Sequence, residues 1–290
     1  MRGEKEMMEL ILGTAQEDER IRAAYMGGSR CNPNAPRDIF QDYDIAYVVK
    51  ETESFQRDPH WIDRFGERLY MQYPEDSSCY PSDKANCYGW LIQFRDGNRI
   101  DLHVQTLKRA LQDFEEDSLC TVLLDKDGIL PQKTQGSDKA FWVSRPTQIQ
   151  FSEVCNEYWW GLNSLQKALW RKEIPYAQWV VNEVLRGQLL TLLSWKIGAR
   201  TDFSCSIGKA GKYMDRWLTK EEYSRFLDTY CPGNAEAMWG AAERMCVFFG
   251  ETARETAALF GFSYNEEEAA ASLGLFRKIR KLPQGAERIC

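Results

Sequence analysis

Two short stretches, Tyr25-Met26-Gly27-Gly28-Ser29-Arg30 and Asp42-Tyr43-Asp44-Ile45, decide the fold of this chain. The first is an apolar step that runs into a pair of glycines, which indicates a turn at the end of a strand. Residues 31–36 contain two prolines and two asparagines, so they predict an irregular loop. The second stretch opens a run of β-forming residues that reaches Val49, and it predicts a strand that begins with two acidic side chains.

The spacing of Asp42 and Asp44 places both carboxylates on one face of the predicted strand, because residues i and i+2 point to the same side. Two such carboxylates repel each other unless a cation lies between them, and Mg²⁺ prefers oxygen ligands of this kind. Gly28 allows close approach of the backbone to a phosphate, and Ser29 adds a hydroxyl donor. An Asp-x-Asp pair alone is more often a solvated strand end. Here an apolar strand follows it and a Gly-Ser turn precedes it, which favours a metal site.

A third carboxylate, Asp101, lies in the strand-like run Arg99–Val104, where polar and apolar residues alternate. This run and Trp90–Phe94 flank Asp96-Gly97, a dipeptide typical of a β-hairpin turn. His103 shares the polar face with Asp101. For His103 we favour a structural or solvent-facing role over a functional one.

The chain changes character near its middle, which predicts two domains. The first part alternates helix and strand: the pattern predicts helices over 4–24 and 60–72, and a strand over 121–125. The second part predicts helices only, over residues 152–171, 175–198, 219–230, 234–250 and 265–280. We therefore predict an α+β fold with a mixed-sheet domain over 1–137 and a helical bundle domain over 138–290.

Composition excludes several classes of protein. The 290 residues carry a net charge of −6, which argues against a duplex nucleic-acid binder and is compatible with a cationic ligand. No apolar stretch is long enough for a membrane span, and no signal peptide is evident, so a cytoplasmic protein is expected. The nine cysteines form no CxxC pair and there are only two histidines, which disfavours a disulfide framework or a multi-histidine metal site.

The motifs together resemble the aminoglycoside 6-adenylyltransferases that modify streptomycin, within the nucleotidyltransferase superfamily that includes DNA polymerase β. The resemblance extends from about residue 5 to about residue 280 and is carried by Tyr25–Arg30, Asp38–Ile45, Arg99–His103 and Gly208-Lys209-Ala210-Gly211-Lys212-Tyr213. It implies Mg²⁺-dependent transfer of AMP from ATP to the 6-hydroxyl of streptomycin, with release of pyrophosphate. Antibiotic inactivation would follow.

The resemblance also implies roles for individual residues. Asp42 and Asp44 would hold one or two Mg²⁺ ions, and Asp101 would complete a second metal site or, as we prefer, take the proton of the acceptor hydroxyl. Three groups of residues would contact the nucleotide: Gly28, Ser29 and Arg30 at the turn; Lys212 and, less directly supported, Lys209; and Arg186. For the 208–213 segment the alternative is a loop with solvated lysines, and Arg186 could instead pair with Glu183.

The acceptor is a polycation, so it should meet carboxylates and aromatic rings. Glu153, Glu157 and Trp160 are spaced i, i+4 and i+7, which places them on one face of one helix. The alternative is a helix with solvated glutamates and core tryptophans, and we expect Trp159, Trp170, Trp179, Trp195 and Trp217 to lie in the core. Two other functions stay open: a nucleotidyltransferase with another small-molecule or protein acceptor, and a non-catalytic nucleotide-binding regulator. The chain is expected to act as a monomer or homodimer.

Overall fold

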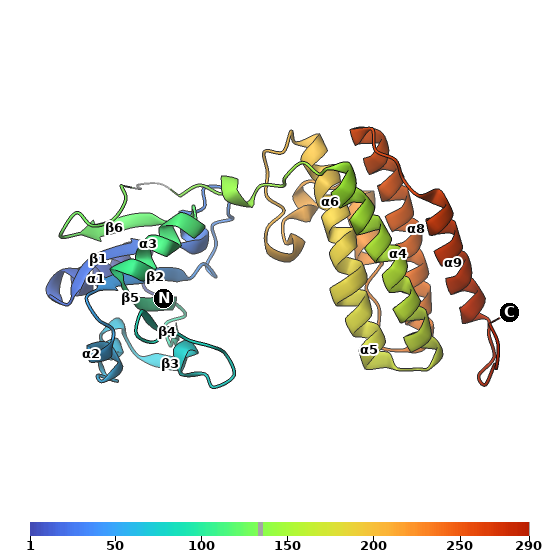
Figure 1. Cartoon of the computed structure of the whole chain (residues 1–290). Coiled ribbons are helices and arrows are strands. Elements are labelled where there is room, and N and C mark those ends of the chain that lie inside the picture. Colours follow the sequence, from blue (N-terminus) through green and yellow to red (C-terminus); the bar gives the residue numbers. More distant parts are fainter. Residues whose placement is uncertain (133–135, 290) are drawn as a thin grey trace. The chain divides into compact units, whose positions relative to one another are not determined.

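The computed structural model describes residues 1–132 and 136–289 and divides the chain into two compact units, Met1–Ala140 and Phe141–Cys290 (Figure 1). The first unit is built on a six-stranded mixed sheet, and the second consists of helices and loops over its described residues. The predicted α+β fold is therefore confirmed. The eight cysteines within the described ranges form no disulfide bonds, and Cys290 lies outside these ranges.

The sheet of the first unit has the strand order β3-β4-β5-β2-β1-β6. Strands β2 and β5 pair in parallel, whereas the other neighbouring pairs are antiparallel. The parallel pair lies in the middle of the sheet, and it brings the two acidic strands side by side. The strands are β1 Ile21–Met26, β2 Tyr43–Val49, β3 Arg68–Gln72, β4 Cys87–Phe94, β5 Arg99–Thr106 and β6 Thr121–Asp125.

Successive side chains of a strand point to opposite faces of the sheet, so the first unit has a separate hydrophobic core on each face. Odd-numbered residues of β2 pack with helix α1 (Glu4–Glu17) and with the aromatic side chains that follow β2. Ala46 and Val48 of β2 point to the other face, where they pack with helix α3 (Leu107–Glu116). Asp44 has the same parity as Ala46, so it points to the α3 face of the sheet.

The predicted helix over 4–24 is wrong in its second half. Helix α1 ends at Glu17, and Ile21 begins strand β1. The carboxylate of Asp18 accepts hydrogen bonds from the backbone and guanidinium of Arg20, which turns the chain. The apolar residues that suggested one helix thus serve a helix and then a strand.

The predicted helix over 60–72 is also wrong. Only Trp61–Phe65 forms a short 3₁₀ helix, together with a four-residue helix α2 (Glu53–Gln56) before it. Gly66 then adopts a φ of +124°, which ends the helix, and the next residues form β3 against β4. The strand depends on this long-range pairing and not on local propensity.

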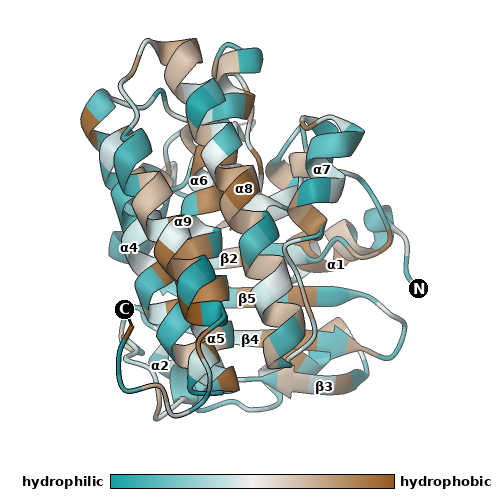
Figure 2. Ribbon diagram, turned by 90° about the vertical axis from the view of Figure 1, so that its right-hand side faces the viewer, coloured by the Kyte–Doolittle hydropathy of each residue, from teal (hydrophilic) through white to brown (hydrophobic). Residues whose placement is uncertain are grey.

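The second unit has helices in the five predicted places, but the helix predicted to end at 250 continues to Phe260, and the one predicted over 175–198 is divided by a π-helical segment. The helices of this unit are α4 Gln148–Trp170, α5 Ile174–Trp179, α6 Arg186–Arg200, α7 Lys220–Leu227, α8 Ala235–Phe260 and α9 Glu266–Arg280, with a π-helical segment Val180–Leu185 between α5 and α6. Both hydrophilic and hydrophobic residues recur along the length of α8 and α9, as expected of amphipathic helices (Figure 2). Side-chain caps begin several helices; Thr147 and Gln150, for example, form a capping box at α4.

The core of the second unit contains stacked Tyr158 and Phe249, together with Trp159 and Trp195. Trp170 packs at its edge. The expectation of a core position is wrong for Trp179 and Trp217, which are 55% and 38% exposed. No helix within the described ranges combines the length and the apolar character that a membrane span requires.

Candidate active site

Strands β2 and β5 bring the three predicted carboxylates together. Their parallel register places Asp44 directly opposite Asp101, and Asp42 lies one residue before β2. One carboxylate oxygen from each of Asp42, Asp44 and Asp101 lies within 4.8 Å of the other two. The all-oxygen donor set and the excess of negative charge fit a hard divalent cation.

Two of the three carboxylates, Asp44 and Asp101, line a cavity of about 410 Å³ in the first unit. Most of the β2 and β5 residues on its wall point to the α3 face, among them Asp44, Asp101 and His103. Gly27 and Gly28 line it as well. A pocket of this size can hold part of a small-molecule ligand beside the carboxylates.

Burial raises the pKa of Asp44 to about 7, and the charges of Asp42 and Asp101 act in the same direction. Arg99 opposes this rise in pKa. Its guanidinium donates two hydrogen bonds to Asp101, of 2.9 and 2.6 Å, and lies 3.6 Å from Asp42. One arginine therefore faces three carboxylates, which leaves a deficit of positive charge that a bound cation would neutralise.

The glycine turn after β1 is fitted closely to Asp44. The backbone N–H of Gly27 donates a hydrogen bond of 2.9 Å to the Asp44 carbonyl oxygen. Gly28 has a φ of +66°, and a Cβ atom on it would lie 1.9 Å from Asp44 Oδ2. Only glycine fits here, because both the backbone conformation and the neighbouring carboxylate exclude a side chain.

A family model described as streptomycin adenylyltransferase matches residues 1–277. The chain belongs to this family. An aminoglycoside 6-adenylyltransferase of Bacillus subtilis (strain 168) is 40% identical over 240 residues, which are 82% of this chain and 84% of the relative. An aminoglycoside 6-adenylyltransferase of Campylobacter jejuni is 35% identical, and the matched region is 97% of this chain and 97% of the relative. A crystal structure of an aminoglycoside 6-adenyltransferase from Bacillus subtilis is 32% identical, covers 97% of this chain and 100% of its own, and has a TM-score of 0.49.

Membership of the streptomycin adenylyltransferase family makes the chain a nucleotidyltransferase, as the sequence motifs predicted.

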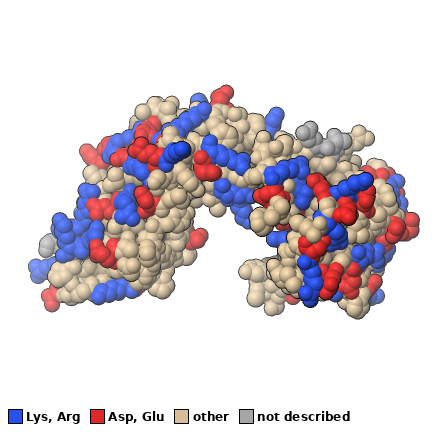
Figure 3. Space-filling model, turned by 180° about the vertical axis from the view of Figure 1, so that it is seen from behind, with Lys and Arg blue, Asp and Glu red and all other residues tan. Residues whose placement is uncertain are grey.

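Positive and negative side chains intermingle over the surface that Figure 3 shows. This surface does not resemble the continuous basic stripe of a duplex-binding protein.

Arg30, predicted as a phosphate ligand, is engaged in contacts within the protein. Its guanidinium donates hydrogen bonds to the carbonyl oxygens of Asp42 and Gln41, of 2.8 and 2.9 Å, and stacks 3.8 Å over the ring of Tyr43. The side chain is only 9% exposed. Arg30 therefore holds the backbone that presents Asp42, and we do not retain it as a phosphate ligand. Ser29 stays beside the turn, where its hydroxyl accepts a long hydrogen bond of 3.4 Å from Gln41.

Arg186 lies in the second unit and is nearly buried, with 5% exposure. It donates to the hydroxyl and to the carbonyl oxygen of Thr229, and it stacks 3.6 Å over the ring of Tyr230. Its Nε also donates a hydrogen bond of 3.3 Å to Asn182 Oδ1. Among the described residues the guanidinium thus contacts Asn182, Thr229 and Tyr230, and no ion pair with Glu183 is found. The guanidinium is committed to packing, so we do not retain Arg186 as a nucleotide ligand.

The segment 208–213 is a loop around a short 3₁₀ turn, Lys209–Gly211. Gly208 and Gly211 both have positive φ, and Lys209 and Lys212 are exposed. The ammonium of Lys212 lies 5.0 Å from the ring centroid of Tyr213. The loop thus presents two cations on a backbone that glycine allows to bend.

The predicted acceptor face exists as a surface of helix α4. Glu153 and Glu157 are exposed there, and Trp160 is 69% exposed, whereas Trp159 points into the core. The structure therefore contradicts the alternative in which Trp160 is a core residue.

Two groups near the carboxylates are not predicted as site residues from the sequence. The first is Arg99, although its i, i+2 spacing from Asp101 places both on one strand face. The second group is an acidic wall at the end of α3 that lines the cavity; we call Asp113, Glu116 and Asp117 the α3 acidic wall. Their i, i+3, i+4 spacing was a signal that they share one helix face.

Proposed function

We propose that the chain transfers AMP from ATP to a hydroxyl of streptomycin and releases pyrophosphate, with Mg²⁺ held by Asp42 and Asp44. The observation that carries this proposal is the convergence of Asp42, Asp44 and Asp101, two of which, Asp44 and Asp101, line a cavity together with the Gly27-Gly28 turn. Membership of the streptomycin adenylyltransferase family supports the reaction type. The 6-hydroxyl as the target rests on the names of the relatives. We propose that the reaction takes place in the cytoplasm.

The chain's own residues would prepare the phosphates for transfer. The Gly28 backbone and the Ser29 hydroxyl line the turn next to the carboxylates, where they would contact phosphate oxygens. Lys212 and Lys209 lie exposed on the 208–213 loop of the second unit, and we keep them as candidate ligands for the phosphates of the nucleotide. When bound, Mg²⁺ would neutralise the charge of the triphosphate and the charge that develops on the leaving pyrophosphate.

Asp101 is our candidate for accepting the proton of the acceptor hydroxyl. Both of its oxygens accept hydrogen bonds from Arg99 in this structure. Each of these oxygens keeps a second lone pair, so Asp101 can accept a hydrogen bond from a substrate hydroxyl while Arg99 stays in place. A positioned general base contributes about 10²–10⁴-fold to the rate of such a transfer.

Incubation with ATP, Mg²⁺ and streptomycin tests the proposed function directly. We expect release of pyrophosphate and a drug product heavier by one AMP, and chelation of the metal should stop both. Turnover with another aminoglycoside but not with streptomycin would contradict the substrate assignment. Binding of ATP without transfer to any acceptor would favour a non-catalytic regulator.

Two surfaces are candidates for the cationic acceptor: the α4 face with Glu153, Glu157 and Trp160, and the α3 acidic wall. Glu116→Gln and Glu157→Gln each remove one negative charge without changing size. A charge-assisted hydrogen bond contributes about 1.5–3 kcal/mol, so a substitution that removes one should raise the KM for streptomycin at least about tenfold. The KM for ATP should change far less. Steady-state kinetics with each substrate varied separately measures the difference.

Glu115→Gln is the matched control for the α3 acidic wall, because Glu115 is an exposed neighbour that does not line the cavity. It should leave both KM values near those of the unmodified enzyme. An equal effect of Glu157→Gln on ATP and on streptomycin would show that the α4 face is not an acceptor surface. An equal effect of Glu116→Gln on the KM for ATP and for streptomycin would show that the α3 acidic wall is not an acceptor surface.

A further inference from the structure

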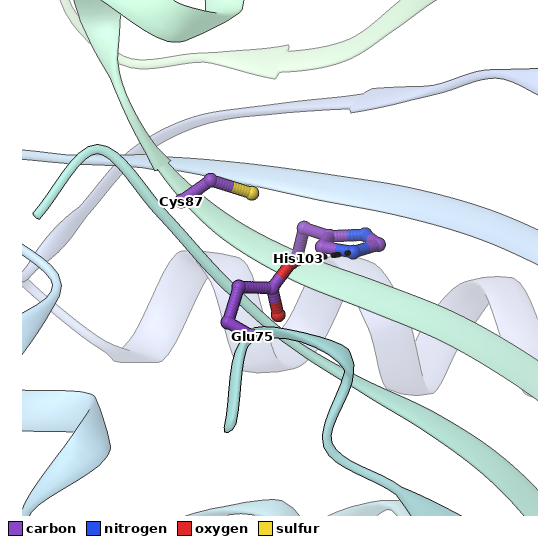
Figure 4. Close-up of side chains that lie close together, drawn as sticks. All are labelled: Glu75, Cys87 and His103. Atoms are coloured by element: carbon purple, nitrogen blue, oxygen red, sulfur yellow. Dashed lines mark ion pairs between the residues drawn. The ribbon is translucent and has the colours of Figure 1, made fainter. Parts of the chain in front are cut away.

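A second cluster of metal-binding side chains lies in the first unit. Glu75 comes from the short 3₁₀ helix Pro74–Asp76, Cys87 begins β4, and His103 lies in β5 (Figure 4). One donor atom from each lies within 4.8 Å of the other two. Glu75 Oε1 and His103 Nε2 are 3.8 Å apart. We call these three residues the Glu-Cys-His cluster.

Backbone contacts prepare this cluster for a ligand. Glu75 Oε2 accepts a hydrogen bond of 2.8 Å from the backbone N–H of Gly89, which fixes the carboxylate and leaves Oε1 directed at the histidine. Gly89 is also the β4 partner of His103 in the strand register. A Cβ atom on Gly89 would lie 2.3 Å from the Cδ2 atom of His103, so glycine keeps the space that the imidazole occupies.

We propose that Glu75, Cys87 and His103 form a zinc site that is separate in its ligands from the Asp42, Asp44 and Asp101 site. Thiolate, imidazole and carboxylate together are ligands that Zn²⁺ accepts, whereas Mg²⁺ selects oxygen ligands. In a tetrahedral zinc site, donor atoms lie roughly 3.3–3.6 Å apart, given metal–ligand distances of about 2.0–2.3 Å. The cluster reaches this geometry if side chains move by about 1 Å.

The remaining tetrahedral position would be open. Three protein ligands with a fourth position for water or a ligand are typical of zinc sites that are not purely structural. His103 lines the same cavity as Asp44 and Asp101, so an ion in the Glu-Cys-His cluster would stand beside the proposed transfer site. Burial, reinforced by the charge of Glu75, raises the pKa of Cys87 to about 11, so metal binding would displace the thiol proton to solvent.

Titration of the chelator-treated full chain with Co²⁺ tests the site without any activity measurement. Co²⁺ adopts the same tetrahedral ligand set as Zn²⁺, and a cobalt–thiolate bond gives a near-ultraviolet charge-transfer absorption. We expect this absorption to saturate at one ion per chain and to disappear when Zn²⁺ displaces Co²⁺. Absence of the absorption in the unmodified chain would overturn the proposal.

Variants identify the ligands. Cys87→Ser should abolish the cobalt–thiolate absorption, and Glu75→Gln should raise the Kd for Co²⁺ at least about tenfold. Cys231→Ser is the matched control, because Cys231 is another half-buried free thiol and lies outside the cluster. Asp44→Asn should leave the absorption intact, which separates this site from the proposed Mg²⁺ site. An absorption that survives Cys87→Ser, or one that is lost in Cys231→Ser, would contradict the ligand assignment.

Discussion

Replacing Asp44 with asparagine should lower adenylyl transfer by about 10³-fold and, in metal-free buffer at pH 8, should raise the thermal stability of the protein. The loss of activity follows from the position of Asp44 between Asp42 and Asp101. A catalytic metal contributes several kcal/mol to transition-state stabilisation, and each 1.4 kcal/mol corresponds to about tenfold in rate. The gain in stability follows from the pKa of the same carboxyl group.

The pKa of Asp44 is raised from its ordinary value of 3.8 to about 7 by burial and by the charges of Asp42 and Asp101. The folded protein therefore binds this proton more tightly than the unfolded chain does. Its stabilising effect is fully present below pH 3.8 and is lost as the pH rises through about 7. Above pH 7 the buried carboxylate costs on the order of 2 kcal/mol, given about 1.4 kcal/mol per pKa unit and sharing among three coupled acids.

Thermal melts at pH 5 and pH 8 measure this effect. The stability gain of Asp44→Asn over the unmodified protein should be larger at pH 8, and added Mg²⁺ should raise the Tm of the unmodified protein only. Asp228→Asn is a suitable control, because Asp228 is exposed and lies in the second unit, far along the chain from the carboxylates. If Asp44→Asn keeps more than about a tenth of the activity, Asp44 is not a metal ligand.

The part of the fold that the sequence predicts correctly depends on local signals. The alternation along Arg99–Thr106 and the Asp96-Gly97 turn specify the hairpin, and Gly97 has a φ of +91°. The Asp42–Val49 pattern specifies a strand with carboxylates at its start. Strand β3 was missed because residues 68–72 carry no strong strand signal of their own. Their conformation depends on pairing with β4, which a local pattern does not reveal.

The candidate site shows the same division between local and long-range information. The placement of the three carboxylates could be predicted, since strand periodicity decides to which face of the sheet an acidic side chain points. The contacts of the arginines could not be predicted, because a long flexible side chain can reach several partners. Arg30 points back to the carbonyl oxygens of the loop, whereas Arg99 reaches the carboxylates. Sequence shows that a cation is present, and only the fold decides which anion or carbonyl it contacts.

Gly28→Ala should lower kcat/KM for adenylyl transfer by about 10²-fold or more. The new Cβ atom would lie 1.9 Å from Asp44 Oδ2, so the carboxylate must move by more than 1 Å. A displacement of about 1 Å at a reacting centre can cost about 10²-fold. The positive φ of Gly28 adds backbone strain of about 1–2 kcal/mol, which melts will detect as lower stability. Mg²⁺ titration should show weaker binding than in the unmodified protein.

Alanine substitutions at two other glycines distinguish the effect of the steric clash with Asp44 from the effect of backbone strain. Gly128 has a φ of +65° and open space around its Cβ position, so Gly128→Ala should reproduce the loss of stability without the loss of activity. Gly27→Ala places a Cβ atom beside the same turn with nothing within 4 Å, and its cost in kcat/KM should stay below about tenfold. Equal losses of activity in Gly27→Ala and Gly28→Ala would mean that the turn tolerates no side chain at either position. The contact with Asp44 would then not be the reason for glycine at position 28.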